Sequence, residues 1–251
     1  MEAEQRAGTV RARSTASASV FSTLLIDAAL VAVADGERAS RVLDVGCGQG
    51  PYRDLLGPTT YVGVDRTHRP GGAAVLADAA ALPVGPACFD GVLCTEVIEH
   101  VPDERALARE LGRVAEPGAV LVLSSPFVHG LHEVPYDFRR RTSIGLVRTL
   151  EGGGCAVERV GAVGGARVVA LDGALRWADG LARRGTRRAF GGSGRAFRAV
   201  ERTSAALQRG LATAVLRRAS ARRGIDPFAP SPRLTLGYVV RARRDRGEAT
   251  S

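Results

Sequence analysis

Three side chains that can hold a proton or a metal ion stand close together in the segment CTEVIEH, residues 94–100. They are Glu96, Glu99 and His100, at positions i, i+3 and i+4, which share one face of the chain if the segment is helical. Carboxylates and imidazoles are common ligands of divalent metal ions, so this face could bind one. Alternatively, the three residues are only the polar end of a buried strand. The elements around the segment must decide between these interpretations.

A second group of reactive side chains lies between residues 125 and 142, in SPFVHGLHEVPYDFRRRT. The group comprises His129, His132, Glu133, Tyr136 and Asp137, followed by three arginines at 139–141. In one interpretation, His132 is a general base or contacts the substrate, and the arginines bind an anionic group. In the other, Asp137 and an arginine form an ion pair that braces the loop, and the histidines face solvent.

Strand-like runs rich in valine and leucine alternate with helix-like segments over most of the chain. Strands are predicted at 41–45, 60–65, 73–78, 90–95, 119–125 and 155–163, and helices at 19–34, 103–116 and 142–154. Such alternation predicts an α/β fold, Rossmann-like and doubly wound, with a mainly parallel sheet covered on both faces. Ligands of these sheets bind at the carboxyl ends of the strands, where both groups of reactive side chains are expected.

The first predicted strand leads directly into a glycine-rich loop, LDVGCGQG, residues 43–50. Gly46, Gly48 and Gly50 would let the backbone turn tightly and approach a ligand closely. The dinucleotide-binding motif G-x-G-x-x-G would require glycine at position 51, where this chain has proline. A nicotinamide cofactor is therefore disfavoured, and the pattern that remains is D-x-G-x-G-x-G, beginning at Asp44.

Acidic residues end the second and third predicted strands. Asp65 follows the glycine loop by about 20 residues, the separation at which an acid binds ribose hydroxyl groups. Asp78 ends the next strand, where a carboxylate could accept a hydrogen bond from an adenine amino group. These positions predict a ligand that contains a nucleoside.

The motifs, in their order and spacing, resemble those of the class I S-adenosylmethionine-dependent methyltransferases. The matching segments are VLDVGCGQG, YVGVD, ADAAALP, FDGVLCTEVIEHVPD and EPGAVLVLSSP within residues 38–165, and LTLGYVVRARR (234–244) resembles the antiparallel last strand of that fold. The resemblance implies S-adenosyl-L-methionine as cofactor. The cofactor-binding residues that it implies are Asp44, Gly46, Gly48, Gly50, Asp65, Asp78, Ala79 and Thr95. In that scheme the glycines and Thr95 lie near the methionine portion, Asp65 holds the ribose, and Asp78 with Ala79 binds the adenine edge.

The segment CTEVIEH also resembles part of two metal-using branches of this family, the quinone O-methyltransferases and the RNA 3′-end methyltransferases. Their magnesium ligands match Glu96, Glu99 and His100. A metal ion there would hold two acceptor hydroxyl groups and lower a hydroxyl pKa. Magnesium prefers oxygen ligands, however, and metal-free members carry a similar EHVPD run that caps and positions the next helix. No metal ligand is therefore assigned, and a metal function depends on whether a histidine or the aspartate of the 125–142 loop reaches the segment.

The 125–142 loop contains the pattern HxxPxDFxRxT, which is similar to one in bacterial methyltransferases of glycans, lipids and other small molecules. The chain is therefore predicted to methylate an oxygen of a small-molecule, sugar or lipid-linked acceptor, with His132 as catalytic residue. Two alternatives stay open. One is an RNA 2′-O-methyltransferase with a metal held by the EVIEH segment, and the other is a non-catalytic regulatory or scaffold protein that binds the cofactor.

Residues 166–231 are predicted as a helical, arginine-rich insertion before the last strand. Within 166–223 there are 14 arginines and three acidic residues, so this segment accounts for all of the chain's net charge of +9. Its pattern predicts an apolar stripe on the second helix, opposite a face of arginines. The stripe comprises Phe197, Val200, Leu207, Leu211 and Val215.

The arginine face has three interpretations. The apolar stripes could cover the core or a second copy of the chain, as in a homodimer, and leave the arginines in solvent. The basic helices could instead lie on an anionic membrane surface, which would suit a lipid-linked acceptor. The arginines could also bind nucleic-acid phosphates, but residues 166–223 offer only Trp177, Phe190 and Phe197 for base stacking, so nucleic acid is the weaker prediction.

These patterns also predict how the chain is organised. Residues 1–17 are predicted as a flexible tail, 18–165 with 232–244 as the cofactor-binding domain, and 166–231 as the insertion. The four cysteines show no CxxC pair, which favours a reducing cytoplasm over a disulfide framework. The apolar run 24–34 contains Asp27 and is too short to span a bilayer. We therefore expect a cytoplasmic protein, with peripheral contact to the inner membrane face as the alternative.

Overall fold

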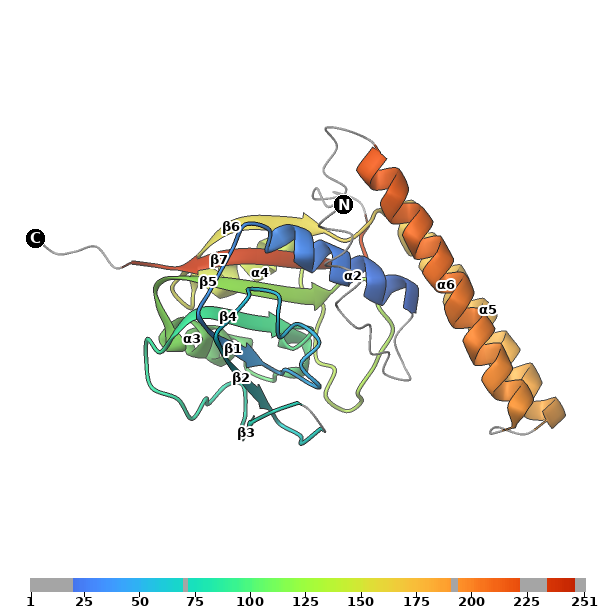
Figure 1. The fold of residues 1–251 in the computed structure, drawn as a ribbon, viewed down its shortest axis with the longest axis horizontal. Coiled ribbons are helices and arrows are strands. Elements are labelled where there is room, and N and C mark those ends of the chain that lie inside the picture. Colours follow the sequence, from blue (N-terminus) through green and yellow to red (C-terminus); the bar gives the residue numbers. More distant parts are fainter. Residues whose placement is uncertain (1–19, 70–71, 191–193, 222–233, 247–251) are drawn as a thin grey trace, which may run out of the picture.

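The computed structural model describes residues 20–69, 72–190, 194–221 and 234–246, and its fold is shown in Figure 1. One seven-stranded sheet forms the centre, with the strand order β3-β2-β1-β4-β5-β7-β6. The strands are β1 (Arg41–Val45), β2 (Thr60–Asp65), β3 (Val75–Leu76), β4 (Phe89–Thr95), β5 (Ala115–Pro126), β6 (Cys155–Ala162) and β7 (Gly237–Arg244). Neighbouring strands pair in parallel except β7, which is antiparallel to both β5 and β6. The predicted mainly parallel, Rossmann-like sheet with an antiparallel last strand is confirmed.

Helices cover both faces of the sheet because its central strands are apolar on both sides. One face is covered by α2 (Val20–Val33), and the other by α3 (Glu104–Val114) and α4 (Ser143–Glu151). Successive residues of β4 belong to opposite cores: Leu93 is buried with the leucines of α2, and Cys94 with those of α3 and α4. This alternation follows from the two-residue period of a strand.

Predicted boundaries were wrong by two or more residues in four elements. α3 ends at Val114, whereas 116 was predicted, because the chain enters β5 at the next residue. β3 contains only Val75–Leu76, whereas 73–78 was predicted, because this edge strand pairs with β2 alone. β5 begins at Ala115, earlier than the predicted 119, because that residue pairs with Phe89 at the start of β4. α4 ends at Glu151, and the glycines that follow it form the turn into β6.

Two long helices, α5 (Ala166–Phe190) and α6 (Arg195–Ala221), occupy the insertion between β6 and β7. They pack against each other as a hairpin that leans on α2 and extends away from the sheet at its far end (Figure 1). Phe197 and Val215 of the predicted apolar stripe are buried or partly buried. Leu207 is 58% exposed, so the stripe was wrong at that position.

None of the helices in the described ranges is both long and apolar enough to cross a membrane. The four cysteines are all free, as the irregular spacing predicted. The predicted tail at 1–17 and the end of the insertion at 222–231 lie outside the described residues.

Candidate active site

A cavity of about 420 Å³ lies at the carboxyl ends of β1, β2 and β4, the edge at which doubly wound sheets bind ligands. Its size falls in the usual range for small-molecule and cofactor sites. The glycine loop and the ends of β2 and β4 form part of its wall, and the loop after β5 forms another part. The lining residues that bear on function are Ser22, Thr23, Ile26, Gly46, Gly48, Asp65, Asp78, Ala79, Thr95, Glu96, His100, His129, His132 and Glu133.

The glycine loop has a backbone conformation that other residues adopt only with strain. Gly46, Gly48 and Gly50 have φ angles of 71°, 55° and 69°, in the left-handed region. Space matters as well at Gly46, because a Cβ atom there would lie 2.3 Å from Cγ2 of Val97. The first two glycines line the cavity and Gly50 does not, so a contact between Gly50 and the cofactor stays a prediction.

Asp65 joins the end of β2 to the glycine loop. Its Oδ2 atom accepts a hydrogen bond from the Gly48 amide at 2.9 Å, and its Oδ1 atom accepts one from the Thr67 amide at 2.9 Å. Oδ1 also accepts a hydrogen bond from the Thr67 hydroxyl group at 3.1 Å, so Oδ2 is the oxygen that keeps a further lone pair for a ligand. Because Asp65 also lines the cavity, it lies where an acid could accept a hydrogen bond from the ribose.

The other predicted cofactor residues fall into two groups. Asp78, Ala79 and Thr95 line the cavity. Asp44 does not: it is fully buried, and its Oδ2 atom accepts the hydroxyl hydrogen of Tyr61 at 2.6 Å. Burial raises the pKa of Asp44 to about 7. Its direct contact with a cofactor stays a prediction, and the contact that the structure shows is with β2.

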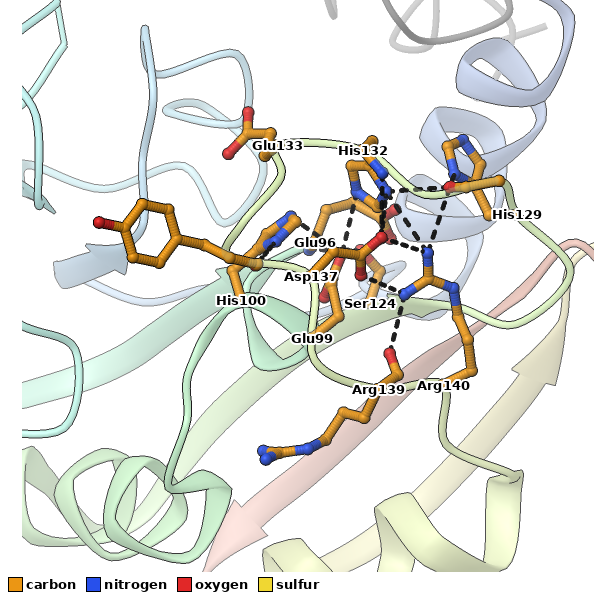
Figure 2. Close-up of polar contacts among 12 residues, drawn as sticks. Glu96, Glu99, His100, Ser124, His129, His132, Glu133, Asp137, Arg139 and Arg140 are labelled. Atoms are coloured by element: carbon orange, nitrogen blue, oxygen red, sulfur yellow. Dashed lines mark hydrogen bonds and ion pairs between the residues drawn. The ribbon is translucent and has the colours of Figure 1, made fainter.

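The segment EVIEH is not the helix that the spacing of its polar residues suggested. Ile98–His100 form a single 3-10 turn, and Glu96 has a φ of 55°, which no right-handed helix allows. The turn buries Glu99 completely, with 0% of its surface exposed, and leaves His100 in the wall of the cavity beside Glu96. The three residues therefore do not share a helix face, although they do gather at one place (Figure 2).

His132, on the loop after β5, completes a cluster with Glu99 and His100 (Figure 2). The Oε1 atom of Glu99 lies 3.6 Å from Nε2 of His100 and 3.8 Å from Nε2 of His132. One ligand atom from each of the three residues lies within 4.8 Å of the other two. Both carboxylate oxygens of Glu99 are buried, and neither has a hydrogen-bond partner among the described residues. Because buried polar atoms need partners, this donor set fits a divalent cation.

The electrostatics of the cluster favour a bound proton or cation. Two causes raise the pKa of Glu96 to about 8: burial, which is the larger, and the negative charge of the Glu99 carboxylate. The Glu99 side chain also raises the pKa of His132 above its ordinary value. Burial lowers the pKa of His129, which lines the same cavity, to about 4. His129 is therefore neutral at pH 7, whereas His132 keeps its proton to higher pH unless a cation replaces that proton.

The loop after β5 is held by its own charged residues, in line with the bracing interpretation. Nη2 of Arg140 lies 2.8 Å from Oδ2 of Asp137, and the His132 amide donates to the same oxygen at 3.0 Å. Arg139 donates to backbone carbonyl groups that follow the 3-10 turn, and Arg141 forms an ion pair with α3. The three arginines are therefore engaged by the protein, and their predicted binding of an anionic group gains no support.

Part of the cavity wall was missed from the sequence. Ser22, Thr23 and Ile26 of α2 line the cavity. Nη2 of Arg176 in α5 donates to Oγ of Ser22 at 3.0 Å, and the charge of Arg176 contributes to the lowered pKa of His129. In the sequence, only the small polar pair Ser22 and Thr23 stands out near the start of this apolar helix. The pair does not indicate that the helix lines a cavity.

The sequence profile of a family described as "Methyltransferase domain" matches residues 19–151, more than half of the chain. A ubiquinone biosynthesis O-methyltransferase from Paracidovorax citrulli is 31% identical over 105 residues, which cover 34% of this chain and 43% of that protein. A protein from Mycolicibacterium smegmatis, described as a probable S-adenosylmethionine-dependent methyltransferase, is 31% identical over 149 residues. That match covers 52% of this chain and 58% of the relative, so the chain spans about half the length of these two proteins.

The fold is also similar to that of a solved S-adenosylmethionine-dependent methyltransferase from Mesorhizobium loti. The TM-score is 0.51, and the match covers 88% of this chain and 98% of that chain. The two sequences are 16% identical, so this likeness bears on the fold alone. With its strand order, its glycine loop and the family match over residues 19–151, the chain belongs to the class I S-adenosylmethionine-dependent methyltransferases.

Proposed function

We propose that this chain binds S-adenosyl-L-methionine and transfers its methyl group to an oxygen atom of a small-molecule, sugar or lipid-linked acceptor. The observation that carries the proposal is a single cavity shared by two sets of residues. Asp65, Asp78 and the glycine loop belong to one set, and His100 and His132 to the other. A cofactor bound by the first set would present its methyl group to an acceptor held by the second.

Methyl transfer depends mainly on the alignment of the acceptor oxygen with the methyl group of the cofactor. A bond forms between the acceptor oxygen and the methyl carbon as the bond from that carbon to sulfur breaks, and the hydroxyl proton is released. Because the sulfonium already activates the carbon, positioning of the two reactants can supply roughly 7–11 kcal/mol of the barrier. Asp65 and Asp78 would provide this positioning on the cofactor side, by holding the ribose and the adenine.

The cluster of Glu99, His100 and His132 would hold a divalent cation at the acceptor end, with Glu96 beside it in the cavity wall. Such a cation, when bound, lowers the pKa of an acceptor hydroxyl group and orients that group. The ring of His132 faces carboxylates at both nitrogens, with Nδ1 3.3 Å from Oδ2 of Asp137 and Nε2 3.8 Å from Oε1 of Glu99. A ring held in this way is poorly placed to take a proton from the acceptor. His132 is therefore proposed as a cation ligand in place of the general base first assigned to it.

His129 is the better candidate for a proton acceptor. It lines the cavity, and its pKa of about 4 leaves it unprotonated at pH 7. A well-placed base contributes about 10²–10⁴-fold to rate, but a base with so low a pKa needs a hydroxyl group that has already been made acidic. The neighbouring cation cluster would meet that need. An oxygen acceptor also agrees with the name of the Paracidovorax relative, an O-methyltransferase.

Two measurements test the proposal in sequence. Calorimetry with S-adenosylmethionine and with S-adenosylhomocysteine should show binding, and undetectable affinity for both would overturn the proposal at its first step. Labelled cofactor is then offered with pools of phenols, sugars, lipid extract and RNA, each with and without a chelator. Label on a hydroxyl acceptor that disappears with chelator and returns with added Mg²⁺ or Mn²⁺ supports the proposal. Label on RNA favours the 2′-O-methyltransferase alternative, and binding without transfer to any pool favours a non-catalytic protein.

A further inference from the structure

The far half of the α5–α6 hairpin exposes large apolar side chains on a strongly basic surface. We refer to residues 177–190 and 195–207 as the distal hairpin. Within it, Trp177 is 67% exposed, Leu181 43% and Leu207 58%. Large apolar groups at this level of exposure often mark a surface that binds a partner or a membrane.

One face of α5 combines apolar residues with basic ones. Trp177, Leu181, Arg184 and Arg188 follow one another at intervals of four, three and four residues. This spacing places them along a single stripe of the helix, and all four side chains are exposed. The stripe thus begins apolar and ends with two cations toward the tip of the hairpin.

The acidic residues of the hairpin are already occupied. Asp172 pairs with Arg176, while Asp179 and Glu201 both pair with Arg183, which joins α5 to α6. Together the two helices contain 12 arginines and only these three acids. Arginines of the distal hairpin without a carboxylate partner in the described part of the chain include Arg184, Arg188, Arg195 and Arg202. The distal hairpin therefore presents uncompensated positive charge.

At its other end, the hairpin contacts the wall of the catalytic cavity. Arg176 donates to Ser22, a lining residue, and the backbone amide of Phe21 donates to Oε1 of Gln208 at 3.2 Å. Gln208 is itself buried, with 6% of its surface exposed. The contacts fix the hairpin next to the part of α2 that lines the cavity.

We propose that the distal hairpin binds the surface of a bilayer that contains anionic lipids. Trp177 and Leu181 enter the headgroup region, where tryptophan is favoured because its ring is apolar and its N–H is polar. The arginines contact the lipid phosphates, and each cation near such a surface adds to the affinity. An amphipathic basic helix that lies in the interface has this combination of residues.

Two other occupants fit this surface less well. A second copy of the chain would bring one arginine face against another, and like charges at an interface oppose association. Single-stranded nucleic acid is usually held by several aromatic side chains, and Trp177 is the one exposed aromatic residue among the described side chains of the hairpin. Both occupants are outcomes that the test below can return.

Membrane binding would have a consequence for catalysis that rests on the proposed function. Because the hairpin is fixed beside the cavity wall, adsorption would bring the cavity close to the bilayer and favour a lipid-linked acceptor. The binding itself is tested without turnover, so its failure and a failure of methyl transfer are separate results.

Trp177 is the only tryptophan in the chain, so its fluorescence reports on the proposed surface directly. The full-length protein is mixed with vesicles of phosphatidylcholine, alone or with phosphatidylglycerol. We expect the emission maximum to shift to the blue, and the protein to sediment, only with the anionic vesicles. Unchanged emission and no sedimentation with anionic vesicles would overturn the proposal. Tight, salt-sensitive RNA binding without lipid binding would also overturn the proposal. So would a dimer whose Trp177 emission is already shifted to the blue before any lipid is added.

A matched pair of variants tests the contribution of charge. Arg184→Glu/Arg188→Glu reverses two exposed charges four residues apart on α5, and Arg105→Glu/Arg109→Glu makes the same change on α3. At the usual contribution of one arginine near an anionic surface, the loss of two arginines alone should weaken binding to anionic vesicles about thirtyfold, and the two added carboxylates should weaken it further. The α3 variant should bind like the wild type. Equal losses in both variants would show an effect of net charge alone and would contradict the assignment to the hairpin.

Discussion

The imidazole of His132 faces the carboxylate of Glu99 across 3.8 Å, measured between Nε2 and Oε1. Glu99 lies in the turn after β4, and His132 lies on the loop after β5. The carboxylate is fully buried and neither of its oxygens has a hydrogen-bond partner in the described part of the chain. A buried carboxylate left in this way is costly, so the pair requires a proton or a cation between its members.

The first prediction concerns Glu99→Gln, which removes the buried charge and nearly keeps the shape. The wild type should gain about 2.7 kcal/mol in its free energy of unfolding at a Mn²⁺ concentration one hundred times the dissociation constant. The variant should gain little at the same concentration and should be at least as stable as the wild type in chelator. Urea unfolding with and without Mn²⁺ measures both effects.

Glu133→Gln is the matched control, because Glu133 also lines the cavity but its side chain is 51% exposed and lies outside the cluster. It should keep the full response to Mn²⁺. Equal responses of wild type and Glu99→Gln would rule out the cation site.

The second prediction concerns Asp65→Asn. Hydrogen bonds from ribose hydroxyl groups to an ionised carboxylate are stronger than those to an amide, so S-adenosylhomocysteine should bind about ten- to a hundredfold more weakly. Calorimetry at a fixed pH gives the two dissociation constants. Asp54→Asn, an exposed residue outside the cavity wall, should bind the ligand like the wild type. An unchanged affinity of Asp65→Asn would remove Asp65 from the cofactor site.

The third prediction is a dependence of stability on pH that arises at Asp44. Burial raises its pKa to about 7 from an ordinary 3.8, so the folded protein binds this proton more tightly than the unfolded chain. The stability that this provides is present at acidic pH and is lost as the pH rises toward 7. Asp44→Asn does not titrate, so between pH 5 and pH 8 it should gain roughly 2–3 kcal/mol relative to the wild type.

Urea unfolding of both proteins at the two pH values measures this gain, because other titrating groups cancel in the difference. Asp54→Asn, at an exposed position, is the control for the substitution itself. A pH-independent difference between Asp44→Asn and the wild type would mean that Asp44 is ionised in the folded protein at pH 5.

The fourth prediction compares two glycines that share a left-handed backbone. Gly36 and Gly46 have φ angles of 79° and 71°, so alanine at either should cost about 1–2 kcal/mol in backbone strain. A Cβ atom at Gly36 meets no atom within 4 Å, whereas at Gly46 it meets Val97. The clash should add about 1–3 kcal/mol to the cost of Gly46→Ala. Equal unfolding free energies for the two variants would mean that Val97 moves aside freely.

Much of the fold could be predicted because its signals are local. The boundaries of β1 and β2 match the predicted 41–45 and 60–65, since each is an apolar run bounded by polar or turn residues. Their order in the sheet came with the family resemblance, and the antiparallel β7 with it. The length of β3 could not be predicted, because a strand at the edge of a sheet ends where its single neighbour stops pairing.

The two ends of the cavity also differed in how far their residues could be predicted from the sequence. Asp65 and Thr95 end their strands and Asp78 lies two residues after β3. Because the ends of parallel strands meet at one edge, the gathering of these residues was predictable. The meeting of Glu99 with His132 was not predictable. It depends on the left-handed residue before the 3-10 turn and on how the later loop folds back over that turn, where the Phe138 amide donates to the Glu99 carbonyl oxygen at 2.8 Å. No sequence pattern in the turn after β4 or in the loop after β5 predicts the contact between Glu99 and His132.

The position of the hairpin between β6 and β7 has a consequence for how this chain can vary. The Val163 amide donates to the Gly237 carbonyl oxygen at 2.9 Å, and the Leu236 amide donates to the Val163 carbonyl oxygen at 3.1 Å. The chain therefore leaves the sheet and rejoins it at one spot, and strand register is set on either side of the insertion. The distal hairpin can therefore change in length without altering the register of β6 and β7, whereas the base of the hairpin must keep its contacts with α2 beside the cavity.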